Sequence, residues 1–491
     1  MSKEGSTLLE LNNLNAIPNN EPLEAAEPPP QKVRSRLSRL KFRRADFIHQ
    51  RQKLLIISLI LLDICLFILA RLFMERKAHF GAEFVKSGHG LGKILIFAFF
   101  QLTSILISIF LFKRLTSIHI NDRIKRKFKY SKTIITVFTL IWIFLTHLTW
   151  IFYNVSIPSD FFFPVLCFLA LGAYIHCAIF LVLFFLIERI TNFLPTKIFI
   201  LQSKTFHTLT AVGLAFLLTI QGHISTLQSP TLKHLNIAIK NLPVEFENFS
   251  VILVSDIHAG PTTGKKRVEE IVEVINNADG DVVAIAGDLV DGYVDYIGDR
   301  IRPLENIKSK YGTYVALGNH EYIHENVDHW IKFFRTSLNL TVLINSAVVI
   351  NRGKEELCLV GVDDFFTASA NVKGHKMDAE KALSECPTNV SATILMEHQP
   401  NGVASVLKTI EKIQKRVDLI LAGHTHAGQM FIVWPIGYLM NHFFYGLYKY
   451  PPSGVQIYVS SGVNYWGPPI KMFPSLCEIV KIQLHRDLSN N

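Results

Sequence analysis

The pattern of apolar and polar positions divides the chain into two halves. From residue 53 to residue 225 the apolar positions form long, nearly uninterrupted runs, whereas beyond residue 250 short apolar runs alternate with segments of helical spacing. An apolar run of about 20 residues is long enough to cross a bilayer as a helix, and short strands that alternate with helices indicate an α/β domain. The pattern therefore predicts an α-helical multi-pass membrane region followed by an α/β domain.

Five runs in the first half have the length, low charge and aromatic content of membrane-spanning helices. They are residues 53–74, 94–112, 133–153, 161–187 and 206–224. Asp63 lies inside the first run and His176 inside the fourth, and ionisable residues at such positions mark functional sites by default. Because neither has an obvious partner in the sequence, contacts with neighbouring helices are favoured over a transport role.

Composition sets the remaining boundaries. Residues 1–31 are polar and contain three consecutive prolines, which is typical of a disordered tail. We expect a basic juxtamembrane segment at 32–52, the membrane region at 53–225, a linker and domain entry at 226–249, the α/β domain at 250–482 and a C-terminal tail at 483–491. Two late apolar runs, 456–461 and 475–484, are expected to complete a second sheet of the domain.

Charge is distributed unevenly between the halves. From residue 226 onward the chain has 24 Lys and Arg against 28 Asp and Glu, a net charge of −4, whereas the preceding residues have 26 against 12, a net charge of +14. The domain is therefore not a basic nucleic-acid binder. The basic residues flank the predicted spans, where anionic lipid attracts them.

The same flanks predict the topology, because short cytosolic loops are enriched in Lys and Arg. Residues 32–53 carry nine Lys and Arg, 113–132 carry eight and 188–205 carry three, whereas the alternate loops 75–93 and 154–160 carry four and none. With five spans, this places the N-terminus in the cytosol and the domain on the lumenal or extracellular side.

Four Asn-x-Ser/Thr sequons agree with this orientation. Asn154 lies in a predicted outer loop, and Asn248, Asn339 and Asn389 lie in the domain. The domain also contains Cys358, Cys386 and Cys477, whose pairing the sequence leaves open. No Cys-x-x-Cys motif occurs, so the cysteines do not indicate a zinc-finger or redox function.

Five polar motifs follow apolar runs of the domain in order. They contain Asp256 and His258, then Asp288, then Asn319 and His320, then His398, and finally His424 and His426. Asp, His and Asn are residue types that hold two divalent cations over a phosphate ester. In α/β sheets, ligands bind beyond the carboxyl ends of the strands. The motifs therefore predict one shared site.

Each motif alone has an ordinary structural explanation, such as a turn aspartate, a helix N-cap or a loop histidine. Their order and their positions at strand ends favour the shared site. In an extended segment, residues i and i+2 face the same side, so Asp256 and His258 are expected to converge. Asp288 is a short carboxylate suited to bridging two cations, and His320, directly after Asn319, is expected to act on substrate.

The series SDIH, GDLVD, GNHE, EHQP and GHTH, spanning residues from about 250 to 480, resembles the calcineurin-like metallophosphoesterases. The stretches GHTHAGQMF and NHFFYGLY are similar to those of transmembrane proteins that carry such a domain. The resemblance implies a four-layer α/β/β/α sandwich. It also implies two divalent metal ions, with Mn, Fe or Zn expected.

The resemblance implies a role for each motif residue. One metal takes Asp256, His258, Asp288 and His426, and the other takes Asp288 as a bridge together with Asn319, His398 and His424. His320 protonates the leaving oxygen or stabilises developing charge. Glu397 either faces away from the site or supports His398 from behind. His324 and His329 lie in the polar segment after GNHE, so they are expected at the surface, with an approach to the metal site as the alternative.

These residues predict a membrane-anchored, two-metal-dependent phosphoesterase that hydrolyses a phosphate mono- or diester, with the bilayer as a partner and no nucleic acid. The alternative is a catalytically silent membrane scaffold or receptor that binds a phosphorylated ligand. A competent residue at every ligand position favours the enzyme. Residues 430–448 are dense in apolar and aromatic groups. They form either a packed loop that buttresses the site or an apolar wall for a lipid-linked ester.

Overall fold

The structure is a computed structural model in which residues 89–119, 130–154, 162–193, 198–324, 326–451, 453–473 and 475–487 are described. Every described residue belongs to one compact unit. The predicted tail 1–31, the basic segment 32–52 and the predicted span 53–74 lie outside the described residues, as does Asp63.

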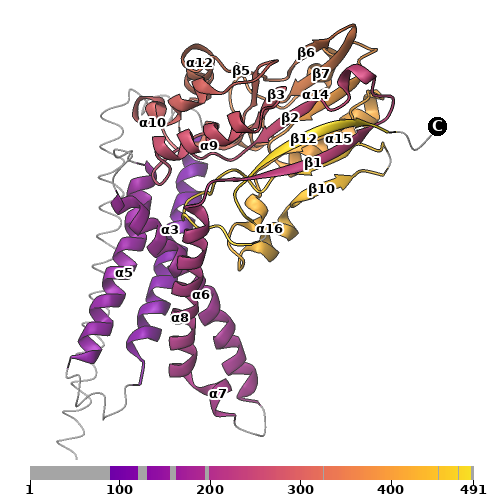
Figure 1. Ribbon diagram of the computed structural model, residues 1–491. Coiled ribbons are helices and arrows are strands. Elements are labelled where there is room, and N and C mark those ends of the chain that lie inside the picture. The colour runs from indigo at the N-terminus through magenta and orange to yellow at the C-terminus, as the bar shows by residue number, and fades with distance from the viewer. Residues whose placement is uncertain are drawn as a thin grey trace, which may run out of the picture. The chain divides into compact units, whose positions relative to one another are not determined.

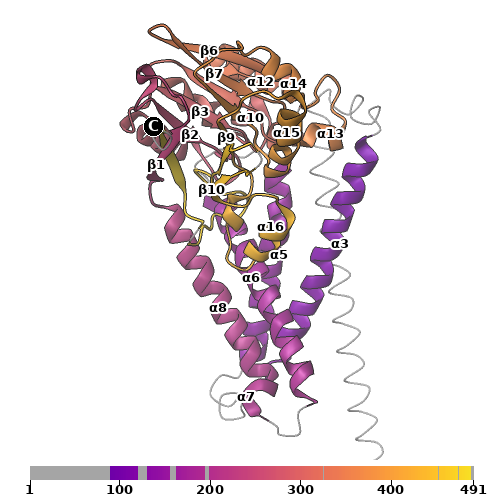
Figure 2. The same cartoon turned by 90° about the vertical axis from the view of Figure 1, so that its right-hand side faces the viewer.

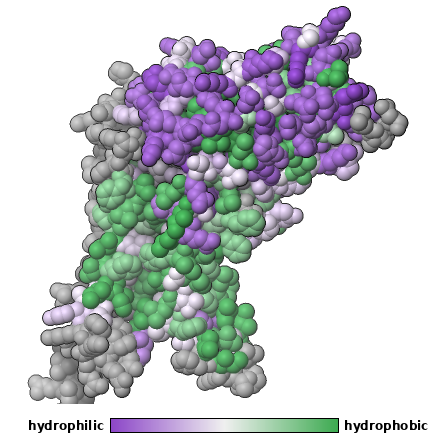
Figure 3. Space-filling view, in the orientation of Figure 1, coloured by the Kyte–Doolittle hydropathy of each residue, from purple (hydrophilic) through white to green (hydrophobic). Residues whose placement is uncertain are grey.

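The first half of the described chain is helical. Its helices are α3 (His89–Thr116), α5 (Ser131–Asn154), α6 (Phe162–Thr191), the short α7 (Phe199–Gln202) and α8 (Lys204–Thr226). Three segments of the described chain are long and apolar enough to cross a membrane: Ser131–Tyr153, Phe162–Thr191 and Lys204–Thr226. They match the last three predicted spans, and the predicted span 94–112 falls within α3. The surface of these helices is largely apolar, whereas that of the domain is largely polar (Figure 3).

Small residues allow the apolar helices to pack closely. In one buried cluster, Trp142 of α5 and Cys177 of α6 pack with Ala211 and Ala215 of α8. His176 is buried among the helices, where its Nδ1 lies 2.9 Å from the Gly172 carbonyl oxygen and 3.4 Å from the Thr219 hydroxyl. For His176, the prediction of contacts with a neighbouring helix is therefore confirmed.

The second half forms two six-stranded mixed sheets (Figure 1). The first sheet has the order β1 (Thr231–Ile239), β12 (Glu478–Arg486), β2 (Ser250–Val254), β3 (Val282–Ala286), β4 (Thr313–Ala316) and β5 (Thr341–Val342). The second has the order β10 (Gly446–Lys449), β11 (Gln456–Val459), β9 (Leu419–Ala422), β8 (Ala392–Met396), β7 (Glu355–Gly361) and β6 (Ser346–Arg352). β2, β3, β4 and β5 are parallel, and so are β7, β8, β9 and β11.

One strand assignment from the sequence is wrong. Residues 456–461 supply β11 to the second sheet as expected, but residues 475–484 supply β12 to the first sheet, between β1 and β2. β12 is parallel to β1 and antiparallel to β2. An apolar run does not specify which sheet it joins, because both sheets present the same kind of buried face.

Two faces of each sheet are buried, which explains why the central strands are apolar throughout. Val251 and Leu253 of β2 face the second sheet and pack in one core with Ile394 and Leu421, while Ile252 and Val254 face the helices on the other side. Because successive side chains in a strand point to opposite faces, a strand buried on both faces has no polar alternation.

Helices cover the outer faces of both sheets (Figures 1 and 2). Over the first sheet lie α9 (Lys265–Asn277), α10 (Val294–Ile301) and α12 (Val327–Ser337), and over the second lie α14 (Ala379–Ser384) and α15 (Pro400–Ile413). Shorter elements are η1 (Val244–Phe246), η2 (Arg302–Asn306), α11 (His320–Ile323), α13 (Phe366–Ala370), η3 (His426–Gly428) and α16 (Trp434–Met440). The layers confirm the α/β/β/α sandwich. A disulfide joins Cys358 of β7 to Cys386 after α14.

Candidate dinuclear metal site

The predicted ligand residues lie in the loops that follow β2, β3, β4, β8 and β9. Several adopt positive φ: Asp256 (59°), His258 (47°), Asp288 (57°), His424 (73°) and His426 (48°). Left-handed backbone is costly for residues other than glycine, and it clusters at functional sites. Asp256 and His258 therefore converge through tight turns and not through the strand alternation that we expected.

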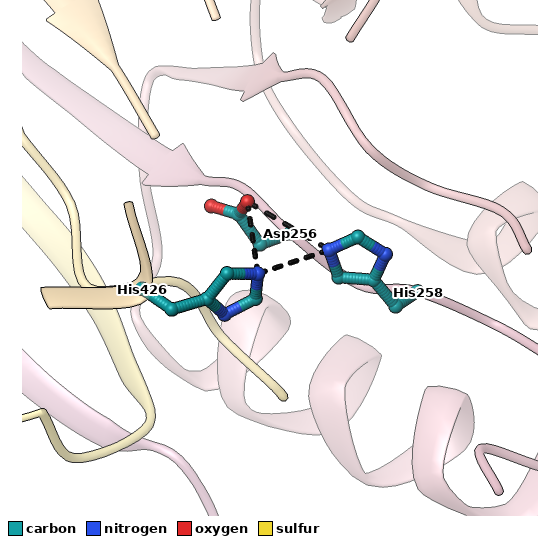
Figure 4. Close-up of side chains that lie close together, drawn as sticks. All are labelled: Asp256, His258 and His426. Carbon is teal, nitrogen blue, oxygen red and sulfur yellow. Dashed lines mark hydrogen bonds and ion pairs between the residues drawn. The ribbon is translucent and has the colours of Figure 1, made fainter. Parts of the chain in front are cut away.

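One group of ligand-type atoms comes from Asp256, His258 and His426 (Figure 4). The Nε2 atoms of His258 and His426 lie 3.0 Å apart, and Asp256 Oδ1 lies 3.8 Å and 3.4 Å from them, respectively. Atoms that each bind one cation at about 2.0–2.2 Å have such separations. Residues 168 positions apart in the sequence thus supply atoms to one point.

A second group contains Asp288, His398 and His424. Asp288 Oδ2 lies 3.0 Å from His398 Nε2 and 3.6 Å from His258 Nε2, which belongs to the first group. Asp288 therefore lies between the two groups, where a bridging carboxylate must be. His398 Nδ1 donates to the Ala286 carbonyl at 2.7 Å, which fixes the ring and leaves Nε2 directed at Asp288.

Two further observations, at Asn319 and His424, indicate that the residues of this site can hold cations. Asn319 is buried, and its Oδ1 has no hydrogen-bond partner among the described residues, which is rare for a buried polar atom. Its neighbours place it at the site, because the backbone N–H of His320 donates to Asp288 Oδ1 at 2.9 Å. Burial and nearby His398 lower the pKa of His424 to about 4, so this ring is in the neutral form that binds metals.

Asp291 has a role that the sequence did not reveal, although it ends the GDLVD motif. Its carboxylate accepts hydrogen bonds from Nδ1 of His258 at 3.3 Å and from Nδ1 of His320 at 2.5 Å. Burial alone would raise the pKa of Asp291, but the two histidines outweigh burial and hold the pKa below its usual range. Asp291 thus orients both rings with Nε2 directed into the site.

His320 has the charge state that its predicted role requires. Burial alone would lower its pKa, but the Asp288 and Asp291 carboxylates outweigh burial and raise the pKa to about 9. Its Nε2 lies 3.9 Å from Asp288 Oδ2, and its ring contacts that of Trp466 with centroids 5.6 Å apart. A protonated imidazole beside the ligand groups is suited to general-acid chemistry.

Two buried glutamates shape the surrounding loops. Glu321 accepts hydrogen bonds from the backbone N–H groups of Asp288 at 3.1 Å, Leu289 at 2.6 Å and Gly318 at 2.7 Å. It thereby joins the loops after β3 and β4. Glu397 faces inward, and its Oε1 accepts hydrogen bonds from the backbone N–H groups of Gln399 at 3.3 Å and Phe365 at 3.4 Å. It therefore braces the loop that carries His398. Neither contact is readable from the sequence, because both depend on where distant loops meet.

The end of α5 also reaches this side of the domain. The ring centroids of Tyr153 and His324 lie 4.7 Å apart, and the Tyr153 hydroxyl lies close to the side chain of Trp466. Asp291 and Asp288 lie within electrostatic range of the same hydroxyl. His324 is buried, contrary to the surface position that we expected, whereas His329 is exposed.

Comparison with known proteins agrees with this geometry. The family described as calcineurin-like phosphoesterase matches residues 249–428. A Caenorhabditis elegans protein named as a metallophosphoesterase is 39% identical over 355 residues, which cover 70% of this chain and 72% of that protein. A Danio rerio transmembrane protein with metallophosphoesterase domain is 33% identical over 327 residues, which cover 65% of this chain and 73% of that protein.

The crystal structure of a dimetal phosphatase from Danio rerio aligns with 49% of this chain and 94% of its own, at 13% identity and a TM-score of 0.29. The family assignment rests on the sequence relatives, both of which are matched over more than two thirds of their length, at 39% and 33% identity. The chain therefore belongs to the calcineurin-like metallophosphoesterase family.

Proposed function

We propose that this protein is a membrane-anchored phosphoesterase that uses two divalent cations to hydrolyse a phosphate mono- or diester. The observation that carries the proposal is the position of Asp288 Oδ2, which faces His258 Nε2 at 3.6 Å and His398 Nε2 at 3.0 Å. One carboxylate thereby serves both groups of ligand atoms. We assign one cation to Asp256, His258, Asp288 and His426, and the other to Asp288, Asn319, His398 and His424.

When bound, the two cations supply Lewis acidity toward the phosphate and a nucleophile derived from water. The protein's own residues do the rest. Asp291 holds His320 Nδ1, so that the Nε2 proton of His320 is directed into the site and can pass to the leaving oxygen. Glu321 fixes the backbone around Asp288 through its N–H contacts. Ligands that are already oriented lose little entropy when the site is assembled.

A substrate and metal screen on the full chain in detergent tests this function. The protein is stripped with a chelator and reloaded with Mn, Fe or Zn, and hydrolysis of bis(p-nitrophenyl) phosphate and p-nitrophenyl phosphate is measured. Metal-dependent turnover of either ester is the expected result. Two bound metals per chain without turnover of any ester would favour the silent scaffold or receptor.

We further propose a lipid-linked ester as the substrate, on the basis of the apolar run 430–448. The run has two parts with different environments. Phe444 is buried and packs against Trp434 and Tyr438, as a buttressing loop would. Phe431 and Leu439 are exposed by 66% and 81%. Replacing Phe444 therefore tests folding, and only the exposed side chains can test contact with lipid.

We propose that the domain is lumenal or extracellular and that the protein crosses the membrane several times. Three sequon asparagines in the domain, Asn248, Asn339 and Asn389, are exposed. The disulfide between Cys358 and Cys386 suits an oxidising compartment. Expression in animal cells should give a glycosidase-sensitive mass shift that disappears when these three asparagines and Asn154 become Gln. Cleavage of the domain by protease added to the cytosolic side of intact vesicles would reject this orientation.

A further inference from the structure

The segment that follows the last ligand pair presents an apolar surface without charge. Residues 427–448 contain no Asp, Glu, Lys or Arg, and α16 within them has no buried residue. We define the α16 surface as the exposed side chains of Phe431, Ile436, Leu439, Met440 and Phe473, whose exposed fractions are 66%, 54%, 81%, 71% and 80%. Several exposed apolar side chains in and beside one short helix indicate an interaction site.

The inner side of this segment packs against membrane-spanning helices. Met430, Ile470 and Met472 form one buried cluster with Leu169 and Leu218, which belong to α6 and α8. Met430 directly precedes Phe431, and Met472 directly precedes Phe473, so the chain passes from that cluster to the exposed positions within one residue. The α16 surface is thus continuous with contacts to α6 and α8.

Two glycines show how closely Ile470 approaches the helices. A Cβ at Gly172 of α6 would lie 2.2 Å from Ile470 Cδ1, and a Cβ at Gly222 of α8 would lie 2.3 Å from Ile470 Cγ2. The backbone is joined as well, because the Lys471 N–H donates to the Gly222 carbonyl at 3.0 Å. Gly222 lies four residues before the end of α8 at Thr226, so this contact is close to one end of a spanning segment.

These observations identify the bilayer as the occupant. A protein surface that continues from spanning helices near their end meets the interface between headgroups and acyl chains. Trp434 and Tyr438 stack at that position, with ring centroids 5.6 Å apart, and Trp and Tyr are the side chains enriched at membrane interfaces. Short uncharged apolar segments bind there with their apolar face about 5–10 Å deep.

The α16 surface is also tied to the metal site. η3 contains His426 and ends at Gly428, and a Cβ at Gly428 would lie 2.8 Å from the Trp434 Cα atom. We propose that the α16 surface is seated in the leaflet that faces the domain and delivers a phosphate ester of a membrane lipid to the ligand groups. The seating stands on geometry alone, whereas the delivery rests on the proposed phosphoesterase function.

The seating is tested by the depth of a nitroxide in the full chain reconstituted in phosphatidylcholine vesicles. Leu439→Cys carries the label on the α16 surface, and Lys332→Cys on exposed α12 is the matched control. Collisions with oxygen should dominate over collisions with a water-soluble nickel chelate at position 439, and the reverse should hold at position 332. Equal access of the nickel chelate at both positions would overturn the proposal. So would shielding of position 439 from both reagents, which indicates a protein partner or a second copy.

The delivery is tested by comparing two esters in the same vesicles. Leu439→Ser combined with Met440→Ser should lower hydrolysis of dioleoyl phosphatidic acid about tenfold or more relative to p-nitrophenyl phosphate. Equal loss on both esters would overturn the delivery. If the wild-type protein hydrolyses neither ester, the proposed function fails for these substrates, and the nitroxide depth still decides the seating.

Discussion

The membrane helices and the domain each bury a cluster of ionisable side chains, and the two clusters differ in how their polar atoms are used. In the helices, Glu188 of α6 pairs with both terminal nitrogens of Arg114 from α3, one of them at 3.1 Å, and with His207 Nδ1 of α8 at 2.9 Å. Arg114 Nε also donates to Thr208 at 3.0 Å. Partners for the carboxylate thus come from within the network itself.

In the domain, several ligand-type atoms are instead turned toward the same points. His258 and His398 each use Nδ1 for a fixed partner, Asp291 and Ala286, and leave Nε2 facing Asp288 Oδ2. Buried polar groups are costly unless paired. Ionisable side chains that pair with one another across helices hold the helices together. Ligand-type atoms that converge on one point indicate a binding site for a cation. The contrast separates a structural cluster from a candidate metal site in the same chain.

Replacing Asp288 is expected to have the largest effect on activity and bound metal. It is therefore the sharpest test of the difference between the two clusters. Asp288→Asn should reduce hydrolysis of bis(p-nitrophenyl) phosphate to background and lower the bound metal per chain, because in the proposed site its carboxylate serves both ligand groups. Asp295→Asn, at an exposed position of α10, is the matched control and should resemble the wild type. Elemental analysis that finds wild-type metal content in the Asp288 variant would contradict the assignment.

Replacing His320 should lower the rate of hydrolysis without changing the amount of bound metal. His320→Ala is expected to lower kcat by about 10²–10⁴-fold, the usual contribution of a general acid, with unchanged metal content. His329→Ala, an exposed histidine on α12, should leave both unchanged. A loss of metal as large as that in the Asp288 variant would show that His320 is a ligand.

Glu188 should show the opposite behaviour. Glu188→Gln leaves Arg114 buried with an incomplete partner and is expected to destabilise the protein by about 3–5 kcal/mol, seen as a lower Tm in detergent. The metal content and the kcat of the folded fraction should stay at the wild-type level. Loss of metal from well-folded protein would remove the distinction between the two clusters.

Asp291 should give a smaller effect, because it acts through the histidines. Asp291→Asn is expected to lower metal affinity or activity by about 10–100-fold, as is usual for residues that orient metal ligands. The variant should also change the pH profile of kcat, since His320 loses one of the two carboxylates that raise its pKa. Its general-acid limb should move to lower pH. An unchanged profile would argue against a positioning role for Asp291.

Tyr153 should give the smallest effect and links the two regions. Tyr153→Phe removes only the hydroxyl near Trp466 and Asp291, so KM is expected to rise by no more than about tenfold, with kcat and metal content retained. A similar rise for Tyr130→Phe, an exposed tyrosine at the start of α5, would show that the effect is not specific to the site.

Local pattern in the sequence was sufficient to find the ligand-type residues. Each follows an apolar strand buried on both faces, so the strand and the polar residue after it are visible together in a few positions. The apolar helices and the alternation that predicts the α/β sandwich are equally local. The sequence could not place β12, because a buried strand is acceptable to either sheet, and register and neighbours depend on contacts far along the chain.

Only the tertiary structure shows which buried polar side chains pair with each other. In the sequence, Arg114 is one of several basic flanking residues and Glu188 is an isolated acid. The folded helices bring these two residues together although they are 74 positions apart. Asp291 reads as a turn aspartate until it meets both His258 and His320. A one-dimensional pattern records whether a position is buried, because burial follows local hydrophobicity. The pairing of buried polar atoms is set by the path of the whole chain, and only the folded structure shows it.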